Sequence, residues 1–148
     1  MTKDRAREAF EAMASHKMNC AQTTFCCFAE DLGLERRRAL EISQGFGGGM
    51  HINSLCGAVT GAYMALGLAN KIQPENPRSG MDKTNEQIKE FNRKFTALYG
   101  SLYCTKLCGF NLSIPEQSAK AREKGVFASV CPALVRDSVK IVEDLLKI

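Results

Sequence analysis

The sequence predicts an all-α fold, a compact helical bundle that forms a single domain over residues 1–148. Three observations predict it. Apolar residues recur at intervals of three and four, the spacing that gathers them on one face of a helix. Capping residues, glycines and prolines stand where these stretches begin and end. No stretch alternates apolar and polar residues as a half-buried strand does, and there is no hairpin signal and no internal repeat.

The first half of the chain contains four predicted helices, at residues 3–14, 20–32 and 35–44, with a fourth that continues to about Asn70. The first places Ala6, Ala9, Phe10 and Met13 on one face. Asn19 caps the second helix, Gln22 completes a capping box, and Gly33 ends it. The charged third helix ends at a glycine-rich loop, and Asn53 or Ser54 caps the fourth.

The second half begins with an exposed loop at residues 71–82, which contains two prolines and a glycine. The helices expected after it cover residues 83–99, 102–108, 115–124 and a C-terminal stretch that Pro132 opens in its first turn. The first of these carries the stripe Ile88, Phe91, Phe95 and Leu98. Gly100 ends that helix, and Ser101 caps the short helix that follows.

Charge and hydropathy argue against nucleic acid and membrane as partners. The net charge is +4, and the one dense basic run, at residues 36–38, has no aromatic residues among it, which is typical of a solvated helix face. Residues 53–70 are the most apolar stretch, but they are rich in glycine and alanine and contain Asn53, so a buried helix is expected. The first dozen residues are charged and lack the apolar segment of a signal peptide.

The loop at residues 45–49 contains four glycines, Gly45, Gly47, Gly48 and Gly49. Glycine serves where the backbone needs a positive φ or must approach another group closely, and its ordering costs entropy. Such a loop is either a binding site or a tight turn that feeds a closely packed helix. Small residues follow at helical spacing, Gly57, Gly61 and Ala65, and this ladder suits either close helix packing or a dimer face.

Seven cysteines are unusual for a chain of this length, and their number is odd. Without an export signal the expected compartment is the reducing cytoplasm, where cysteine clusters serve metal or redox chemistry more often than structural disulfides. The predicted caps place four of them in the first turn of a helix or at its cap: Cys20, Cys56, Cys104 and Cys131. There the unpaired amides and the positive end of the helix dipole stabilise the thiolate, the form that binds metal and attacks disulfides.

The other three cysteines differ in their positions. Cys26 and Cys27 lie in the middle of a helix and are expected to be small apolar core residues. Cys108 lies at a helix C-terminus, where the dipole disfavours a thiolate. No CxxC pair is present, so a site must be assembled by the fold, and only Cys104 and Cys108 are brought together by one helix. Four converging thiolates suit an iron–sulfur cluster or structural zinc, and two suffice for a redox disulfide.

No other enzyme class is indicated by the residues. His16 and His51 are the two histidines, and His51 is expected to face solvent beside the glycine loop. There is no Ser-His-Asp order and no phosphate-binding loop, and GFGGG does not match the dinucleotide fingerprint. Whether the chain is an enzyme is left open at this point.

Several motifs resemble, in order from about residue 19 to the C-terminus, the redox-active family named for the pattern C, GCAxxG, C, C. They are NCAQ at 19–22, GFGGGM at 45–50, CGAVTGA at 56–62, YGSLYC at 99–104 and Cys131 before an amphipathic helix. The four pattern cysteines correspond to Cys20, Cys56, Cys104 and Cys131. One departure is that this chain has Cys56-Gly57-Ala58 where the name has Gly-Cys-Ala, which displaces the sulfur by one position.

The resemblance implies redox activity and leaves three functions to compare. In the favoured one, Cys20, Cys56, Cys104 and Cys131 hold an iron–sulfur cluster for electron transfer to a redox partner protein. Backbone amides of Gly47, Gly48, Gly49 and Gly57 would then contact the cofactor. Alternatively, two of the four thiols cycle between dithiol and disulfide without metal. The third reading is a structural zinc module for protein–protein contacts, and a homodimer is compatible with each.

Overall fold

The structure is a computed structural model, and it describes residues 3–148. Over these residues it contains α-helices and short 3₁₀ turns and no β-strand, so the all-α prediction is confirmed. The helices are α1 (Arg5–Ala14), α2 (Cys20–Ala29), α3 (Arg36–Ser43), α4 (Gly57–Ala69), α5 (Met81–Tyr99), α6 (Cys104–Cys108), α7 (Pro115–Glu123), α8 (Val126–Ser129) and α9 (Cys131–Leu146). The 3₁₀ turns η1 (Gln44–Phe46) and η2 (Gly48–His51) lie in the glycine loop.

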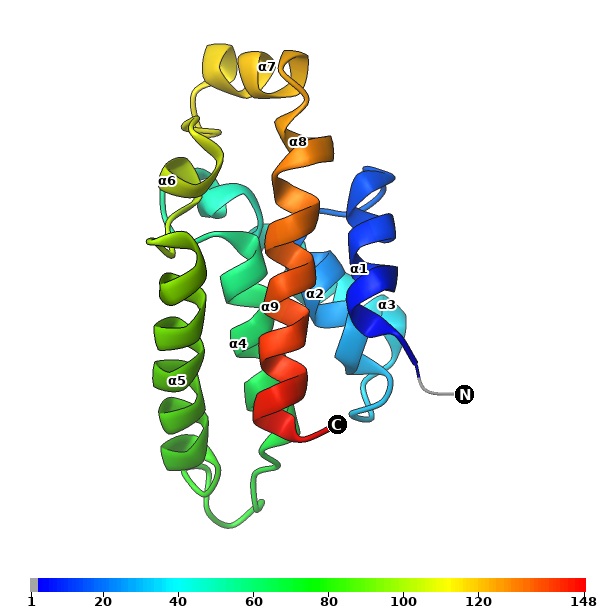
Figure 1. The fold of residues 1–148 in the computed structure, drawn as a ribbon. Helices are drawn as coiled ribbons and strands as arrows, with labels where there is room; N and C mark the ends of the chain where they lie inside the picture. The colour runs from blue at the N-terminus through cyan, green and yellow to red at the C-terminus, as the bar shows by residue number, and fades with distance from the viewer. Residues whose placement is uncertain (1–2) are drawn as a thin grey trace.

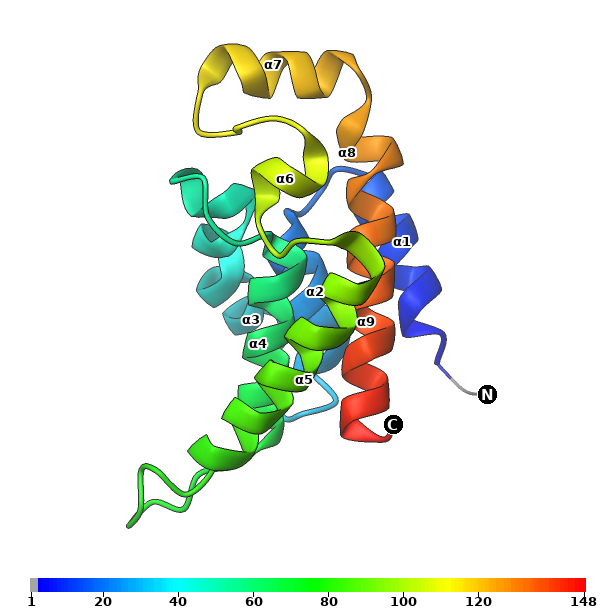
Figure 2. The same ribbon diagram turned by 60° about the vertical axis from the view of Figure 1, so that its left-hand side comes forward.

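Helices α2, α4 and α9 form the centre of the bundle, with α1 against α9 and α5 on the outer side of α4 and α9 (Figures 1 and 2). All three central helices begin at the end of the bundle that carries α6, while α7 lies across the top of that end. The first turns of three long helices therefore meet in one region. No helix in residues 3–148 is both long and apolar enough to span a membrane.

The small-residue ladder of α4 is used for packing inside this chain. A Cβ atom at Gly61 would lie 2.7 Å from the carbonyl oxygen of Ala21 and 2.8 Å from Cβ of Thr24, both in α2. Ala65 is fully buried, one turn further along α4. Close approach of α2 and α4 thus accounts for these residues, and the ladder does not provide a dimer face.

Capping sets where the cysteine-bearing helices begin. The box predicted at Asn19 is present, because its side chain accepts from the Gln22 backbone amide at 2.9 Å and the Gln22 side chain accepts from Asn19 at 3.0 Å. The caps predicted at Asn53 or Ser54 are wrong: Asn53 has a positive φ of 59°, and Cys56 itself is the N-cap of α4. Ser101 likewise lies before α6, whose first residue is Cys104.

The prediction that Leu98 belongs to the buried stripe of α5 is also wrong. Phe91 and Phe95 are fully buried, but Leu98 is 61% exposed. The buried face continues instead to Tyr99, four residues after Phe95, whose ring lies 5.0 Å from that of Phe95. Because each residue advances about 100° around a helix, the step from Phe95 to Tyr99 stays closer to the core than the step to Leu98.

Candidate functional site

Five cysteine side chains line one cavity of about 120 Å³ at the end of the bundle where α2, α4 and α9 begin. They comprise the four predicted by the sequence, Cys20, Cys56, Cys104 and Cys131, together with Cys108. All five are buried. The rest of the lining is mostly apolar, with Met13, Leu112, Phe127 and Leu134 among it. The fold therefore brings together thiols that are up to 111 positions apart in the sequence, from Cys20 to Cys131.

Each predicted cysteine reaches the cavity from the start of its own helix. Cys20, Cys104 and Cys131 are the first residues of α2, α6 and α9, and Cys56 is the N-cap of α4. Two backbone hydrogen bonds fix α6 beside α4: Cys104 N–H donates to Ser54 at 3.0 Å, and Cys56 N–H donates to Leu102 at 2.9 Å. The amides of several helix N-termini thus surround the sulfur atoms, which favours negative charge there.

Cys20 and Cys56 form a close pair in which Cys20 carries the negative charge. The pKa of Cys20 is lowered to about 6, first by a hydrogen bond from the Cys56 thiol and then, against the cost of burial, by the backbone amides of Gly48 and Gly57. The pKa of Cys56 is raised, because its proton is held in the hydrogen bond to Cys20 and its sulfur is buried. A thiolate at Cys20 is therefore available near neutral pH.

Gly57 makes room for the Cys20 sulfur. A Cβ atom at Gly57 would lie 2.2 Å from Sγ of Cys20 and 2.7 Å from the backbone nitrogen of Ala21. No other residue type fits there without displacing α2 or α4, so Gly57 is required by the close approach of the sulfur to the start of α4.

Cys104 and Cys108 form a second close pair, on one face of α6, with their Sγ atoms 4.0 Å apart. The pKa of Cys108 is lowered to about 6 by the hydrogen bond from the Cys104 thiol, against the cost of burial. Its sulfur also lies 3.2 Å from the carbonyl oxygen of Phe110. The pKa of Cys104 is raised by the same hydrogen bond from its thiol and by burial. The prediction that a thiolate is disfavoured at Cys108 is wrong, because the hydrogen bond from Cys104 outweighs the weak dipole of a five-residue helix.

Cys131 differs from both pairs. Burial raises its pKa to about 12, and the negative charge of the neighbouring cysteines adds to the increase. Without a cation nearby, Cys131 therefore stays protonated at neutral pH. Cys56, Cys104 and Cys131, whose pKa values are all raised, therefore keep their protons at neutral pH unless positive charge is bound among the thiols.

The glycine loop forms part of the wall of the site. Gly49 is buried at a positive φ of 67°, and a Cβ atom there would lie 3.1 Å from Cβ of Cys104. Gly47 lies against Asn19, where a Cβ atom would approach the side chain to 2.5 Å. Gly48, also at positive φ, supplies one of the amides that face Cys20. The loop is thus a tight turn that also brings backbone close to two of the cysteines.

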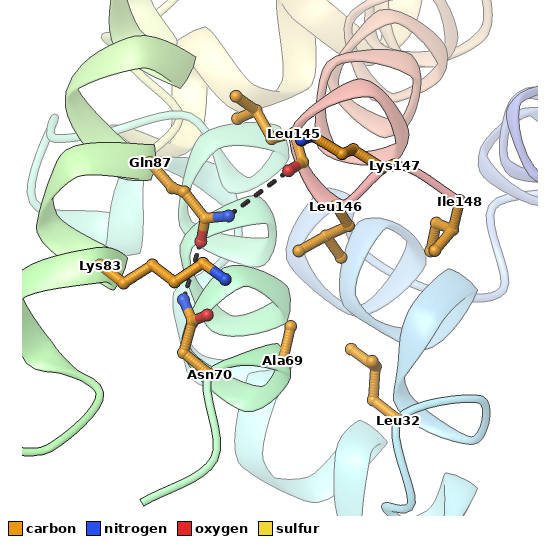
Figure 3. A pocket seen from close by; sticks show the side chains of 9 residues that line it. All are labelled: Leu32, Ala69, Asn70, Lys83, Gln87, Leu145, Leu146, Lys147 and Ile148. Atoms are coloured by element: carbon orange, nitrogen blue, oxygen red, sulfur yellow. Dashed lines mark hydrogen bonds between the residues drawn. The ribbon is translucent and has the colours of Figure 1, made fainter.

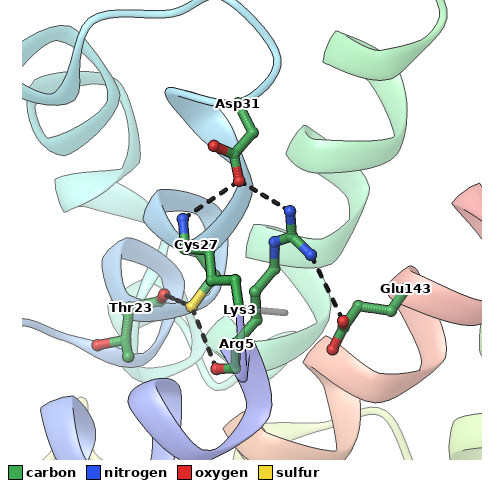
Figure 4. A network of polar contacts seen from close by, with 6 residues as sticks. All are labelled: Lys3, Arg5, Thr23, Cys27, Asp31 and Glu143. Carbon is green, nitrogen blue, oxygen red and sulfur yellow. Dashed lines mark hydrogen bonds and ion pairs between the residues drawn. The ribbon is translucent and has the colours of Figure 1, made fainter. Parts of the chain in front are cut away.

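Cys26 and Cys27 do not line this cavity. Burial raises the pKa of Cys27 to about 12, and its thiol donates to the carbonyl oxygens of Thr23, at 3.2 Å, and Arg5 (Figure 4). Arg5 in turn bridges Asp31 at 2.8 Å and Glu143 at 3.5 Å, which ties α1 to α9 and the end of α2. Cys27 is accordingly surrounded by contacts that hold helices together.

A larger cavity, of about 470 Å³, lies at the opposite end of the bundle and contains no cysteine (Figure 3). Gln87 links three helices beside it: its side chain accepts from Asn70 at 2.7 Å and donates to the Leu145 carbonyl at 3.4 Å. Both histidines are exposed, as predicted for His51. Five of the seven cysteines therefore lie at the α6 end.

The thiols are spread over the walls of the cavity and do not converge on one point. Within residues 3–148, no three His, Cys, Asp or Glu side chains lie close enough together to hold a single metal ion. A mononuclear zinc site needs four ligands at about 2.0–2.3 Å from one ion. A cluster makes a different demand, because its cysteine sulfurs bind different iron atoms.

The fold and this cavity define a cysteine-rich all-α protein in which five of the seven thiols line one buried site. A family model described as "Putative redox-active protein (C_GCAxxG_C_C)" matches residues 18–145. The chain belongs to this family, which confirms the resemblance seen in the sequence. No curated protein and no solved structure matches the chain.

The lowered pKa of Cys20 predicts its reactivity. In the reduced, metal-free chain, we expect alkylation of Cys20 to reach half its maximal rate near pH 6, against about 8.5 for an ordinary thiol. Because the pKa is lowered, the thiolate forms as the pH rises through 6 and is lost below it. Iodoacetamide pulses across the pH range, followed by tryptic digestion and tandem mass spectrometry of the peptide covering residues 18–36, measure this directly.

Cys131 and a Cys56 variant provide the comparisons. Cys131, on the peptide covering residues 125–136, should stay unreactive until far higher pH, because its pKa is raised to about 12. Cys56→Ala removes the hydrogen bond that lowers the pKa of Cys20 most, so the midpoint of Cys20 should move toward about 8.5. A wild-type Cys20 that already titrates at that value contradicts the arrangement described here.

Proposed function

We propose that the chain holds an iron–sulfur cluster in the cysteine cavity and uses it for electron transfer with a redox partner protein. The observation that carries this proposal is that thiols from the starts of four separate helices line one buried, mostly apolar cavity. The cluster ligands in this proposal are Cys20, Cys56, Cys104 and Cys131. Four cysteine thiolates are the usual ligand set of such clusters.

The electrostatics of the cavity support a cationic occupant. In the absence of bound positive charge, Cys56, Cys104 and Cys131 all have raised pKa values. Metal ions invert this relation, because a coordinated thiol loses its proton. A bound metal group would therefore turn these neutral thiols into thiolates, which are strong ligands for soft metals.

The size and shape of the site favour a cluster over a single ion. The thiols stand on different walls of a cavity of about 120 Å³, and no three of them converge on one point. A compact inorganic group with several iron atoms would fill the space and meet ligands that lie apart.

The residues around the thiols have definable roles. When bound, the cluster accepts or gives up an electron. Backbone amides of Gly48 and Gly57 already face the Cys20 sulfur, and hydrogen bonds to sulfur are among the factors that set the potential of such sites. Gly49 holds the loop against Cys104. The apolar side chains of Leu112, Phe127 and Leu134 keep water from the cavity.

Metal and sulfide analysis of protein purified without oxygen tests this function. We expect iron, acid-labile sulfide and a broad visible absorbance that fades in air. Cys56→Ser should remove most of the iron and the absorbance, because it replaces a thiolate ligand. Cys27→Ser is the matched control and should leave both unchanged, since Cys27 does not line the cavity.

Other outcomes select the other functions. A colourless, metal-free sample contradicts the cluster and favours a thiol–disulfide oxidoreductase or redox sensor. One zinc per chain without iron favours a structural zinc module, and unfolding on chelation would support it.

A further inference from the structure

The cavity contains one thiol more than the family pattern provides. Cys108 is outside the four pattern positions, yet it lies in the cavity wall with its Sγ atom 4.0 Å from that of Cys104. The two residues are the first and the last of α6, one helical turn apart. Thiols at this distance can react with each other once the short helix that carries them adjusts locally.

We propose that Cys104 and Cys108 are a modification site, a dithiol that is oxidised reversibly to a disulfide within α6. Cys108 thereby becomes a functional residue of the site, and disulfide formation becomes one of its reactions. The disulfide itself does not require a bound cluster. Its consequence for the cluster rests on the function proposed above, because the bond takes Cys104 away from its role as a ligand.

The backbone of α6 allows the bond and also makes it labile. Side chains four residues apart on a helix have Cβ atoms about 5–6 Å apart, whereas a relaxed disulfide needs roughly 3.5–4.5 Å. The two sulfur atoms must also approach from 4.0 Å to about 2.05 Å. A helix of five residues that ends at Gly109, with φ of 85°, can tighten or unwind locally to permit this. The remaining strain makes the bond easy to reduce, as in regulatory disulfides.

The reaction balances with a low-molecular-weight disulfide such as oxidised glutathione as the oxidant. One thiolate of the pair attacks the disulfide, forms a mixed disulfide and releases one glutathione thiolate, which takes up a proton. The second thiol of the pair then loses its proton, displaces the other glutathione and closes the Cys104–Cys108 bond. The pair is oxidised by two electrons, and one oxidised glutathione is reduced to two thiols.

The position of the pair distinguishes it from the other cysteines. Cys20 is enclosed between α2 and the start of α4, where Gly57 leaves room for its sulfur and little more. Cys26 and Cys27 are consecutive residues of α2, so their side chains leave the helix in different directions. Cys104 and Cys108 are held on a short helix that is anchored mainly through the glycine loop and residues 54–56.

Trypsin provides a specific test, because Lys106 lies between the two cysteines. Digestion places Cys104 on the peptide of residues 95–106 and Cys108 on the peptide of residues 107–120, with no other cysteine on either. The full chain is equilibrated with mixtures of reduced and oxidised glutathione, blocked with an alkylating agent in denaturant and digested without reductant. We expect these two peptides to become joined as the mixture becomes more oxidising, and to separate again when reductant is added.

Variants and iron content separate this inference from the proposed function. Cys108→Ser should abolish the joined peptides and leave Cys104 as a mixed disulfide with glutathione, whereas Cys27→Ser should change nothing. If the chain contains iron, oxidised glutathione should release it in step with the joined peptides, and more slowly from Cys108→Ser. The inference is overturned if the peptides never join, or if Cys108 joins instead the peptide of residues 39–71 or 125–136. Joined peptides in a chain without iron would contradict the proposed cluster and would still support the disulfide.

Discussion

Gly57→Ala is expected to destabilise the protein by about 3 kcal/mol or more, at the upper end of the cost of overpacking a core. The added Cβ atom would lie 2.2 Å from the Cys20 sulfur and 2.7 Å from the backbone nitrogen of Ala21. Because one of these contacts is backbone, α2 and α4 must move apart at the start of both helices. Thermal or urea unfolding of the reduced chain measures the change.

Gly67→Ala, in the same helix, is the matched control. Gly67 is exposed, and nothing lies within 4 Å of a Cβ atom at that position. Alanine favours a helix over glycine by up to about 1 kcal/mol, so Gly67→Ala should leave stability unchanged or raise it. If Gly57→Ala proves as stable as Gly67→Ala, the close approach of Cys20 to α4 is wrong. Gly57→Ala should also raise the pKa of Cys20, because the added Cβ atom displaces the Cys20 sulfur from the amides at the start of α4.

Phe91→Ala is expected to cost about 3–5 kcal/mol, the usual range for a buried aromatic residue. Phe91 is fully buried between Tyr63, whose ring lies 6.0 Å away and edge-on, and Phe95, whose ring is stacked at 5.6 Å. Its removal leaves a void where α5 meets α4. For a domain of this size, such a loss corresponds to a fall in Tm of roughly 6–20 °C.

Leu98→Ala tests the same helix at a position that the sequence pattern alone also places in the core. Because Leu98 is 61% exposed, its truncation should change stability by no more than about 0.5 kcal/mol. A loss at Leu98 comparable with the loss at Phe91 would mean that this face is covered, for example by a second copy of the chain. Measurement of the oligomeric state of the wild type would then show whether a second copy of the chain covers this face.

Local sequence signals were enough for most of the helices, because capping and periodicity act over a few residues. The short helix α8 (Val126–Ser129) was not predicted. Asn19 and Gln22 form the capping box that their spacing predicts, and it places Cys20 in the first turn of α2. Gly100 and Gly109 end their helices in the left-handed conformation, as glycine permits. The first-turn positions of four cysteines follow from the same kind of signal. The thiolate predicted from those positions is found for Cys20 alone. Hydrogen bonds to a neighbouring cysteine raise the pKa of Cys56 and Cys104, and burial raises that of Cys131.

The exact caps were less predictable where tertiary contacts decide them. Cys56, instead of Asn53 or Ser54, begins α4, because residues 54–56 pair with the segment before α6 through backbone hydrogen bonds. That pairing joins parts of the chain almost 50 residues apart, so it cannot be predicted from the residues next to Cys56. The exposure of Leu98 has a similar origin, since the packing of α5 on α4 and α9 selects which side of a broad stripe is buried.

The sequence by itself determined the all-α class, the family and the four cysteines at helix starts, because each depends on residue type and short spacing. Only the tertiary structure decided that these thiols share one cavity, since parallel packing of α2, α4 and α9 brings their first turns to one end. It also decided the place of Cys108 and its lowered pKa. A thiol is tuned by the charges and amides that surround it in space, and for Cys108 these outweigh the helix position that the sequence records.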